Sequence, residues 1–182
     1  MSKFGLRKLG FGILLFGMAV CCYTASPVKA AETDVPIDDT NFPDSTFQKY
    51  VKSNFDTDKD GSLSESERNA VKKIVVNVDP FSSQTKITSL AGIEYFPNLT
   101  VLECESNSLA GLDVTKNKKL QELNCDKNNL QSLDVSQNTE LIKLQCRYNQ
   151  LPGLDVTKNT NLQKLWIYEN QITSFDLSKN NE

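Results

Sequence analysis

Hydrophobic positions in the second half of the chain recur every 21 residues. Residues 99–180 fall into four successive rows that agree column by column. Six columns are apolar: Leu99/Leu120/Leu141/Leu162, Leu102/Leu123/Leu144/Leu165, Cys104/Cys125/Cys146/Ile167, Leu109/Leu130/Leu151/Ile172, Leu112/Leu133/Leu154/Phe175 and Val114/Val135/Val156/Leu177. Two columns are asparagine: Asn107/Asn128/Asn149/Asn170 and Asn117/Asn138/Asn159/Asn180. A fixed period of this length predicts a solenoid, because one coil cannot bury its apolar face alone and neighbouring coils must stack.

The repeat unit reads L-x-x-L-x-C-x-x-N-x-L-x-x-L-D-V-[ST]-x-N. At this spacing it resembles the leucine-rich repeat family. The resemblance implies a solenoid over residues 74–182 with 21-residue coils and a parallel β ladder, in an α+β chain. Val71, Ile74 and Val76 mimic the first apolar columns, so a degenerate first coil begins there, and residues 79–85 form an inserted loop.

The first thirty residues have the layout of a secretory signal peptide. Lys3, Arg7 and Lys8 precede the apolar run 9–20, and Val28 and Ala30 place small residues before a cleavage site at Ala31. The run is shorter than the roughly 20 residues that a membrane span needs, so the mature chain is expected to have no transmembrane span. The segment also resembles the YSIRK-type signal peptides of Gram-positive surface proteins.

Charge and composition narrow the function classes. The first thirty residues hold four of the 20 basic residues and no acid, which leaves 16 bases against 23 acids and a mature net charge of −7. This charge argues against nucleic acid and anionic membranes as partners. The absence of histidine excludes Ser-His-Asp and Cys-His catalysis and histidine-ligated zinc.

Residues 41–73 predict a small helical cap that follows a flexible lead-in at residues 31–40. Pro43 suits a first helical turn, and Phe47, Val51 and Phe55 then lie on one helical face. The next twelve residues match the calcium loop of an EF-hand. Their expected oxygen ligands are Asp56, Asp58, Asp60, Ser62 (through its carbonyl), Ser64 and Glu67.

Calcium is the expected cofactor, because a bidentate Glu67 allows seven ligands around a hard cation. The competing interpretation is an Asp-rich solvated turn. Without a metal, however, four carboxylates this close would repel one another. Sensor hands work in pairs, so a single loop indicates a structural site. Ser64 and Glu67 also fit a capping box for the following helix.

The order of cap and repeats resembles secreted bacterial proteins of the internalin type. In that family, an EF-hand-like helical unit covers the first coil of the solenoid. The resemblance spans residues 41–182, but the 21-residue unit with its cysteine column and the intact calcium loop depart from internalins proper. A cap is physically required, because the first coil would otherwise expose unpaired strand groups and half a core.

The remaining cysteines are Cys21 and Cys22 in the leader and three in one inward column of the repeat. The column is best interpreted as core, because a buried free cysteine behaves as a small hydrophobe. A metal site or a disulfide within the column would require the core to open.

The outward positions of the strands predict one concave face. They align in three columns: Val101/Glu122/Lys143/Lys164, Glu103/Asn124/Gln145/Trp166 and Glu105/Asp126/Arg147/Tyr168. This patch grades from acidic near the cap to basic and aromatic at the far end. Arginine, tryptophan and tyrosine are enriched at binding hot spots. The competing interpretation is an ordinary solvated sheet face, which explains Trp166 poorly because a large exposed indole is not needed for solubility.

The expected function is a non-enzymatic, secreted or cell-surface module that binds a protein on a host or neighbouring cell. The paired acids Glu103 and Glu105 lack a pocket that would shift their pKa for catalysis. A glycan ligand stacked on Trp166 and Tyr168, or a dockerin-like assembly role, stays open as the alternative. The repeats continue to Asn180 without a capping segment, so the chain is either a fragment or its last coil is covered by something else.

Overall fold

The computed structural model describes residues 33–180. The chain divides into two units, Met1–Ala31 and Glu32–Glu182, and the described residues belong to the second. The signal peptide expected at residues 1–30, with Cys21 and Cys22, lies outside the described residues. None of the helices between residues 33 and 180 has the length and apolar character needed to cross a membrane.

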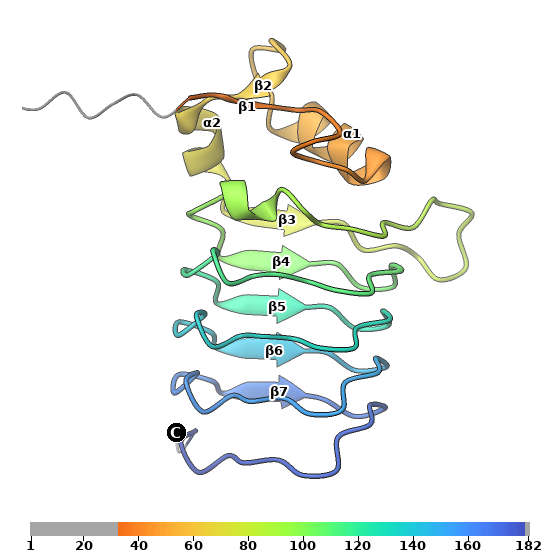
Figure 1. Ribbon diagram of the computed structural model, residues 1–182, viewed down its shortest axis with the longest axis vertical. Coiled ribbons are helices and arrows are strands. Elements are labelled where there is room, and N and C mark those ends of the chain that lie inside the picture. Colours follow the sequence, from red (N-terminus) through yellow and green to blue (C-terminus); the bar gives the residue numbers. More distant parts are fainter. Residues whose placement is uncertain (1–32, 181–182) are drawn as a thin grey trace, which may run out of the picture. The chain divides into compact units, whose positions relative to one another are not determined.

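Five short strands form one parallel sheet in the order of the sequence (Figure 1). The strands are β3 (Lys73–Val75), β4 (Val101–Glu103), β5 (Glu122–Asn124), β6 (Lys143–Gln145) and β7 (Lys164–Trp166). Leu102, Leu123, Leu144 and Leu165 are register partners, one in each successive strand. The parallel ladder predicted from the repeat is therefore confirmed.

The first coil is longer than the others. Ile74 of β3 pairs with Leu102 of β4, so 28 residues separate these partners where later partners are 21 apart. The seven extra residues equal the length of the expected insertion at 79–85, which extends away from the coils in Figure 1. Phe81 lies in this loop with 97% of its surface exposed.

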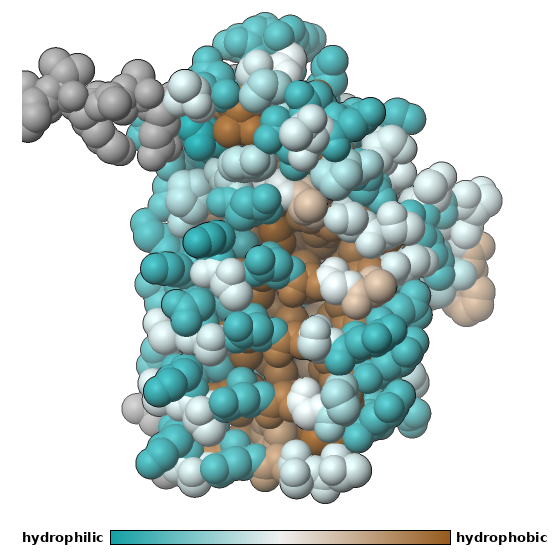
Figure 2. Space-filling view, viewed as in Figure 1, coloured by the Kyte–Doolittle hydropathy of each residue, from teal (hydrophilic) through white to brown (hydrophobic). Residues whose placement is uncertain are grey.

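One continuous core runs through the described residues. The leucine, valine and cysteine columns of successive coils stack in it, and it continues into the cap through Phe47, Val51 and Leu63. Figure 2 shows an apolar stripe running down the stacked coils between hydrophilic margins. Each coil therefore completes the core of the next, as a solenoid requires.

Asparagine side chains join the coils where the backbone turns. Asn128 Nδ2 donates to the carbonyl of Cys104 in the preceding coil at 3.0 Å and to the carbonyl of Cys125 in its own coil at 3.1 Å. Its Oδ1 accepts from Leu109 N–H at 3.1 Å. Asn107, Asn149 and Asn170 repeat this arrangement.

The second asparagine column also joins neighbouring coils, but its side-chain N–H groups donate only to the preceding coil. Asn138 Nδ2 donates to the carbonyls of Val114 and Asn117, both at 2.9 Å, and Asn159 repeats the contacts one coil later. Asn117, Asn138 and Asn159 are fully buried. These side chains satisfy carbonyls that the short strands leave inside the core, where an unpaired polar group is costly.

The cap consists of α1 (Ser45–Asn54) and α2 (Glu65–Ala70). Pro43 precedes α1 instead of lying in its first turn, and Asp44 is the N-cap: its Oδ1 accepts from Thr46 N–H at 2.9 Å and from Phe47 N–H at 3.0 Å. Its Oδ2 accepts from Thr88 N–H of the first coil at 2.8 Å. One carboxylate thus caps a helix and ties the cap to the solenoid.

Aromatic rings fill the junction between the cap and the first coil. Phe55 packs edge-on against Phe96 with ring centroids 5.3 Å apart, and Phe42 lies 5.8 Å from Tyr95. Gly92 has φ +106°, and a Cβ there would overlap the Phe42 ring. These ring contacts join the residues on either side of α1 to the first coil.

The lead-in differs from its prediction. Residues 31–40 were expected to be flexible, but Val35–Pro36 forms strand β1 and pairs antiparallel with β2 (Ser62–Leu63). Val35 is buried, and Asp38 closes a turn by accepting from the N–H groups of Thr40 and Asn41, each at 3.0 Å. The acidic residues that suggested flexibility are exposed, whereas Val35 and Ile37 pack in or against the core.

The asparagine columns lead to a stability prediction. We expect Asn128→Ala to lower the free energy of unfolding by about 3 kcal/mol, because it leaves buried carbonyls and the Leu109 N–H without partners. Asn129→Ala is the matched control, since Asn129 is the exposed neighbour. Urea unfolding of both variants measures the difference. Equal stability of the two would contradict the role assigned to the column.

Candidate functional site

The loop between α1 and β2 brings together three of the expected metal ligands. One carboxylate oxygen from each of Asp56, Asp58 and Asp60 lies within 4.8 Å of the others. Two residues with positive φ, Lys59 at 62° and Gly61 at 88°, turn the backbone tightly between them. The sharp turn that Gly61 was expected to provide is therefore present, and it points the three side chains at one region.

Hydrogen bonds inside the loop hold these carboxylates but leave one oxygen without a partner. Gly61 N–H donates to Asp56 Oδ2 at 3.1 Å, Asp60 N–H to Asp58 Oδ1 at 3.2 Å, and Ser62 N–H to Asp60 Oδ1 at 2.8 Å. Asp56 is 5% exposed, and its Oδ1 is buried with no hydrogen-bond partner. A buried carboxylate oxygen without a donor is costly unless a cation or a donor satisfies it.

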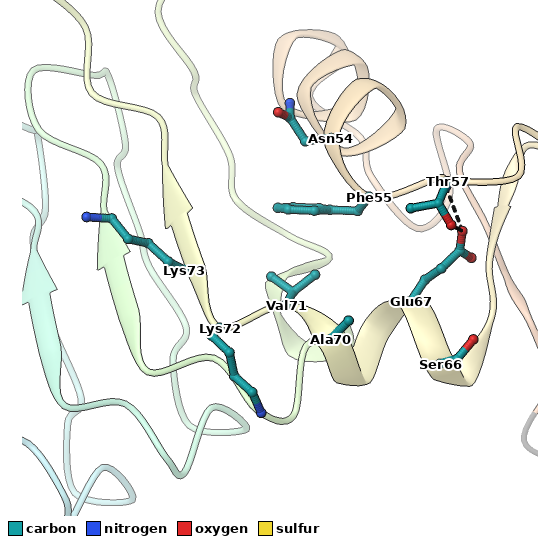
Figure 3. A pocket seen from close by; sticks show the side chains of 9 residues that line it. All are labelled: Asn54, Phe55, Thr57, Ser66, Glu67, Ala70, Val71, Lys72 and Lys73. Carbon is teal, nitrogen blue, oxygen red and sulfur yellow. Dashed lines mark hydrogen bonds between the residues drawn. The ribbon is translucent and has the colours of Figure 1, made fainter.

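Glu67 stands apart from the three aspartates. Its Oε1 accepts from Thr57 N–H at 2.6 Å and from Thr57 Oγ1 at 2.7 Å (Figure 3). Its Oε2 accepts from the N–H and hydroxyl of Ser64, at 2.9 and 2.8 Å, and the Glu67 N–H donates to Ser64 Oγ at 3.3 Å, which completes the expected capping box of α2. Burial opposes ionisation, yet the Thr57 and Ser64 hydrogen bonds lower the pKa of Glu67 to about 2.

Beside Glu67, an open groove of ≈ 440 Å³ lies between the end of α1 and the start of β3. Phe55, Ala70 and Val71 form its apolar lining, and Lys72 and Lys73 lie at its far side (Figure 3). Glu67 is the only acid among the lining residues, and both of its oxygens are bound to other groups. Among the residues that line this groove, no carboxylate is without a hydrogen-bond partner.

The expected concave columns are present in the expected register. Glu122 pairs with Lys143 and Lys143 with Lys164, while Asn124 pairs with Gln145 and Gln145 with Trp166. These positions alternate with the buried leucine column, so they share the outer side of the sheet. The backbone register of these two columns therefore matches the 21-residue alignment.

Ion pairs across the coils neutralise the acidic end of the face. Lys73 Nζ lies 2.7 Å from Glu103 Oε1, and Lys127 Nζ lies 2.8 Å from Glu105 Oε1. These hydrogen bonds lower the pKa of both glutamates. The three outward columns alone suggested an acidic end near the cap. Lys73 and Lys127, which are not in these columns, neutralise that end. Exposed pairs of this kind contribute little to stability.

Asp126 was wrongly assigned to the contact surface. It is fully buried, its Oδ1 accepts from Arg147 N–H at 2.6 Å, and its Oδ2 accepts from Arg147 Nε at 2.7 Å and also contacts Arg147 Nη2. The Asp126 hydrogen bond is the main cause of the raised pKa of Arg147. Asp126 therefore orients Arg147 instead of meeting a ligand itself.

Aromatic rings gather beside Arg147. The Arg147 guanidinium lies 5.4 Å from the centroid of the Tyr168 ring and donates to the Tyr168 hydroxyl at 3.0 Å. Tyr148 packs edge-on against Tyr168, with centroids 5.6 Å apart. Lys143 Nζ lies 6.0 Å from the centroid of the half-buried Trp166. We call Arg147, Tyr148, Trp166 and Tyr168 the aromatic cluster.

Sequence reasoning missed Tyr148. It follows the last outward position of its coil, in a column with Ser106, Lys127 and Glu169 whose members all have positive φ between 52° and 63°. This turn conformation directs Tyr148 back onto Tyr168, and both remain exposed, at 47% and 51%. The inward–outward alternation of side chains along a strand does not continue through such a turn. The only sign in the sequence that Tyr148 could belong to a binding surface was that it is aromatic.

The cysteine column lies inside the coils. Cys104, Cys125 and Cys146 are free thiols and fully buried. Cys104 and Cys125 each donate weakly to a carbonyl of the next coil at 3.4 Å. Burial raises the pKa of all three, that of Cys146 to about 12. The column therefore consists of neutral core side chains.

Solved structures with the same arrangement exist, although no protein-family model and no curated protein sequence match the chain. The functional domain of InlJ from Listeria monocytogenes, described as including a cysteine ladder, has 33% sequence identity and a TM-score of 0.73 over 82% of this chain and 32% of that one. Internalin C2 from the same species has 21% identity and a TM-score of 0.58 over 80% of this chain and 72% of that one. The internalin InlF, also from this species, has 21% identity and a TM-score of 0.53, covering 80% and 48% of the two chains.

The chain has an internalin-like leucine-rich-repeat fold. It spans about a third of the length of the InlJ domain. In this internalin-like solenoid the repeated sequence determines the coils. The cap, the aromatic cluster and the aspartate loop are the features that differ from the repeat and present exposed rings or carboxylates.

The buried column gives a prediction about thiol chemistry. In a chain that begins at Ala31, we expect the three cysteines to resist labelling by a maleimide in the native state, because the reactive thiolate is scarce and inaccessible. Full labelling should follow denaturation in guanidinium chloride, measured by mass spectrometry. Rapid labelling of Cys125 in the folded protein would show that the column opens.

Proposed function

We propose that the chain is a non-enzymatic extracellular module that binds a protein on a host or neighbouring cell surface through the aromatic cluster. One observation carries the proposal: two exposed tyrosines pack edge-on beside an arginine that a buried carboxylate holds in place. Fixed aromatic and arginine side chains lose little entropy on binding and are enriched at hot spots. The internalin-like fold supports a protein partner, and the leader pattern supports secretion.

The position of the cluster shifts the expected contact surface toward the end of the sheet distant from the cap. Glu103 and Glu105 already have lysine partners, so a ligand gains little there. Gln145 is the register partner of Trp166, and Lys143 Nζ lies 6.0 Å from the centroid of its ring, so polar residues border Trp166 as they border the core of an interface. A central aromatic anchor with a polar rim is the layout we assign to this surface.

A glycan is the second candidate ligand. Tyr168, Tyr148 and Trp166 offer ring faces of the kind that stack on sugars, and the cluster is open to solvent. The two classes separate directly when the chain is applied to a glycan array and, in parallel, used to capture surface proteins that are then purified and tested one by one.

The cluster gives a binding prediction. We expect Tyr168→Ala to weaken the affinity for the purified ligand by roughly thirtyfold, about 2 kcal/mol, as for a hot-spot residue. Phe81→Ala is the control, because it removes an exposed aromatic ring in the 79–85 loop outside the cluster. Surface plasmon resonance measures both. An unchanged affinity of the Tyr168 variant would place the contact elsewhere.

We further propose that the aspartate loop holds a structural calcium ion. The support is the grouping of Asp56, Asp58 and Asp60 together with the unpartnered, buried Oδ1 of Asp56. All of these are hard oxygen donors, which calcium prefers. Ser62 and Ser64 add oxygens to the same loop, and Glu67 is the sixth ligand once it releases Thr57.

Calcium should therefore stabilise the cap. We expect saturating calcium to raise the melting temperature of the chain, with a gain of about 2.7 kcal/mol at a hundredfold excess over Kd. Asp56→Asn should abolish the gain, whereas Asp113→Asn, an exposed aspartate in a turn of the solenoid, should keep it. Differential scanning calorimetry with and without a chelator gives the readout, and a melting temperature indifferent to calcium would reject the site.

A further inference from the structure

Strand β1 is joined to the aspartate loop rather than to the solenoid. Val35 pairs with Leu63 and Pro36 with Ser62, and Ile37 N–H donates to the Gly61 carbonyl at 2.9 Å. Residues 33–37, which we call the strap, thus run along the outside of the loop directly after its glycine turn.

The register of this pairing decides which way the Ser62 carbonyl points. In an antiparallel pair, hydrogen-bonded positions alternate along each strand. Because Gly61 bonds outward to the strap, the N–H and carbonyl of Ser62 face the other way. The Ser62 N–H confirms this by donating to Asp60 Oδ1 at 2.8 Å. The register therefore turns the Ser62 carbonyl away from the strap, to the side on which the Ser62 N–H meets Asp60.

The strap is itself anchored by packing. Val35 is 9% exposed and Leu63, its partner, is fully buried, while Ile37 packs partly buried against the core. Pro36, between them, is exposed. This alternation fits a strand with one face on the cap, and the Asp38 turn then leads into the buried Phe42.

We propose that the strap is a positioning element of the calcium site, so that pairing of β1 sets the calcium affinity and calcium binding in turn orders the strap. The inference rests on the proposed calcium site. The loop has to keep three carboxylates and one carbonyl directed at a single point, and pairing removes the backbone freedom that would disperse them. By thermodynamic linkage, the effect of strap on ion and of ion on strap must be equal.

Calcium titration calorimetry tests the inference on the chain that begins at Ala31. Val35→Asp, which places a charge at the buried strap position, should raise the Kd for calcium at least about tenfold, as for other groups that orient metal ligands. Pro36→Ala, on the exposed face of the same strand, should leave Kd within about twofold. A chain that begins at Asp38 and lacks the strap should match the Val35 variant, which separates loss of pairing from misfolding caused by the new charge.

Hydrogen exchange supplies the reciprocal readout. Calcium should slow exchange of the Ile37 and Leu63 amides in the unaltered chain and leave the Leu144 amide of the solenoid unchanged. Equal Kd values for the unaltered and strapless chains would overturn the role of the strap while leaving the calcium site intact. Absence of calcium binding in the unaltered chain would instead reject the site, and the strap's role with it.

Discussion

The structure depends on the hydrogen bonds that asparagine side chains make between coils. Strands of three residues satisfy only a small part of each 21-residue coil. The remaining backbone turns through the interior, where unpaired carbonyls would be costly. Asn107, Asn128 and their counterparts donate to carbonyls of two coils at once, so the leucine and cysteine columns can pack without leaving polar backbone groups unsatisfied.

This constraint explains why the charged and aromatic side chains that could bind a ligand occupy the outward positions of the coils. Positions inside a coil are committed to packing or to backbone hydrogen bonds, and the buried cysteines follow the same rule. Outward positions are free to vary, and there the coils accumulate ion pairs near the cap and aromatic rings at the far end. The buried Asp126 links the inward and outward positions, because its own side chain is inside the coil and its carboxylate accepts from the outward-facing Arg147.

The cap solves a different problem, since it has to end the solenoid with elements that are not repeats. Asp44 links the start of α1 to Thr88, and Phe55 packs on Phe96. The loop between the two helices carries acidic groups that repel one another unless a cation or hydrogen bonds offset them. A cation there, and a strand paired along the outside of the loop, would both stiffen the part of the molecule that has no neighbouring coil on its far side.

The sequence by itself determined the coils, their register and the composition of the concave face, because a strict 21-residue period leaves one way to stack the columns. It also placed Asp56, Asp58 and Asp60 together, since their spacing acts within one local turn. Only the tertiary structure decided that Val35 and Pro36 form a strand, that Asp126 is buried, that Lys73 and Lys127 neutralise the glutamates, and that Tyr148 joins Tyr168. Each of these depends on a contact between residues far apart in the chain or on a turn with positive φ, and neither follows from the alternation of side chains along a strand.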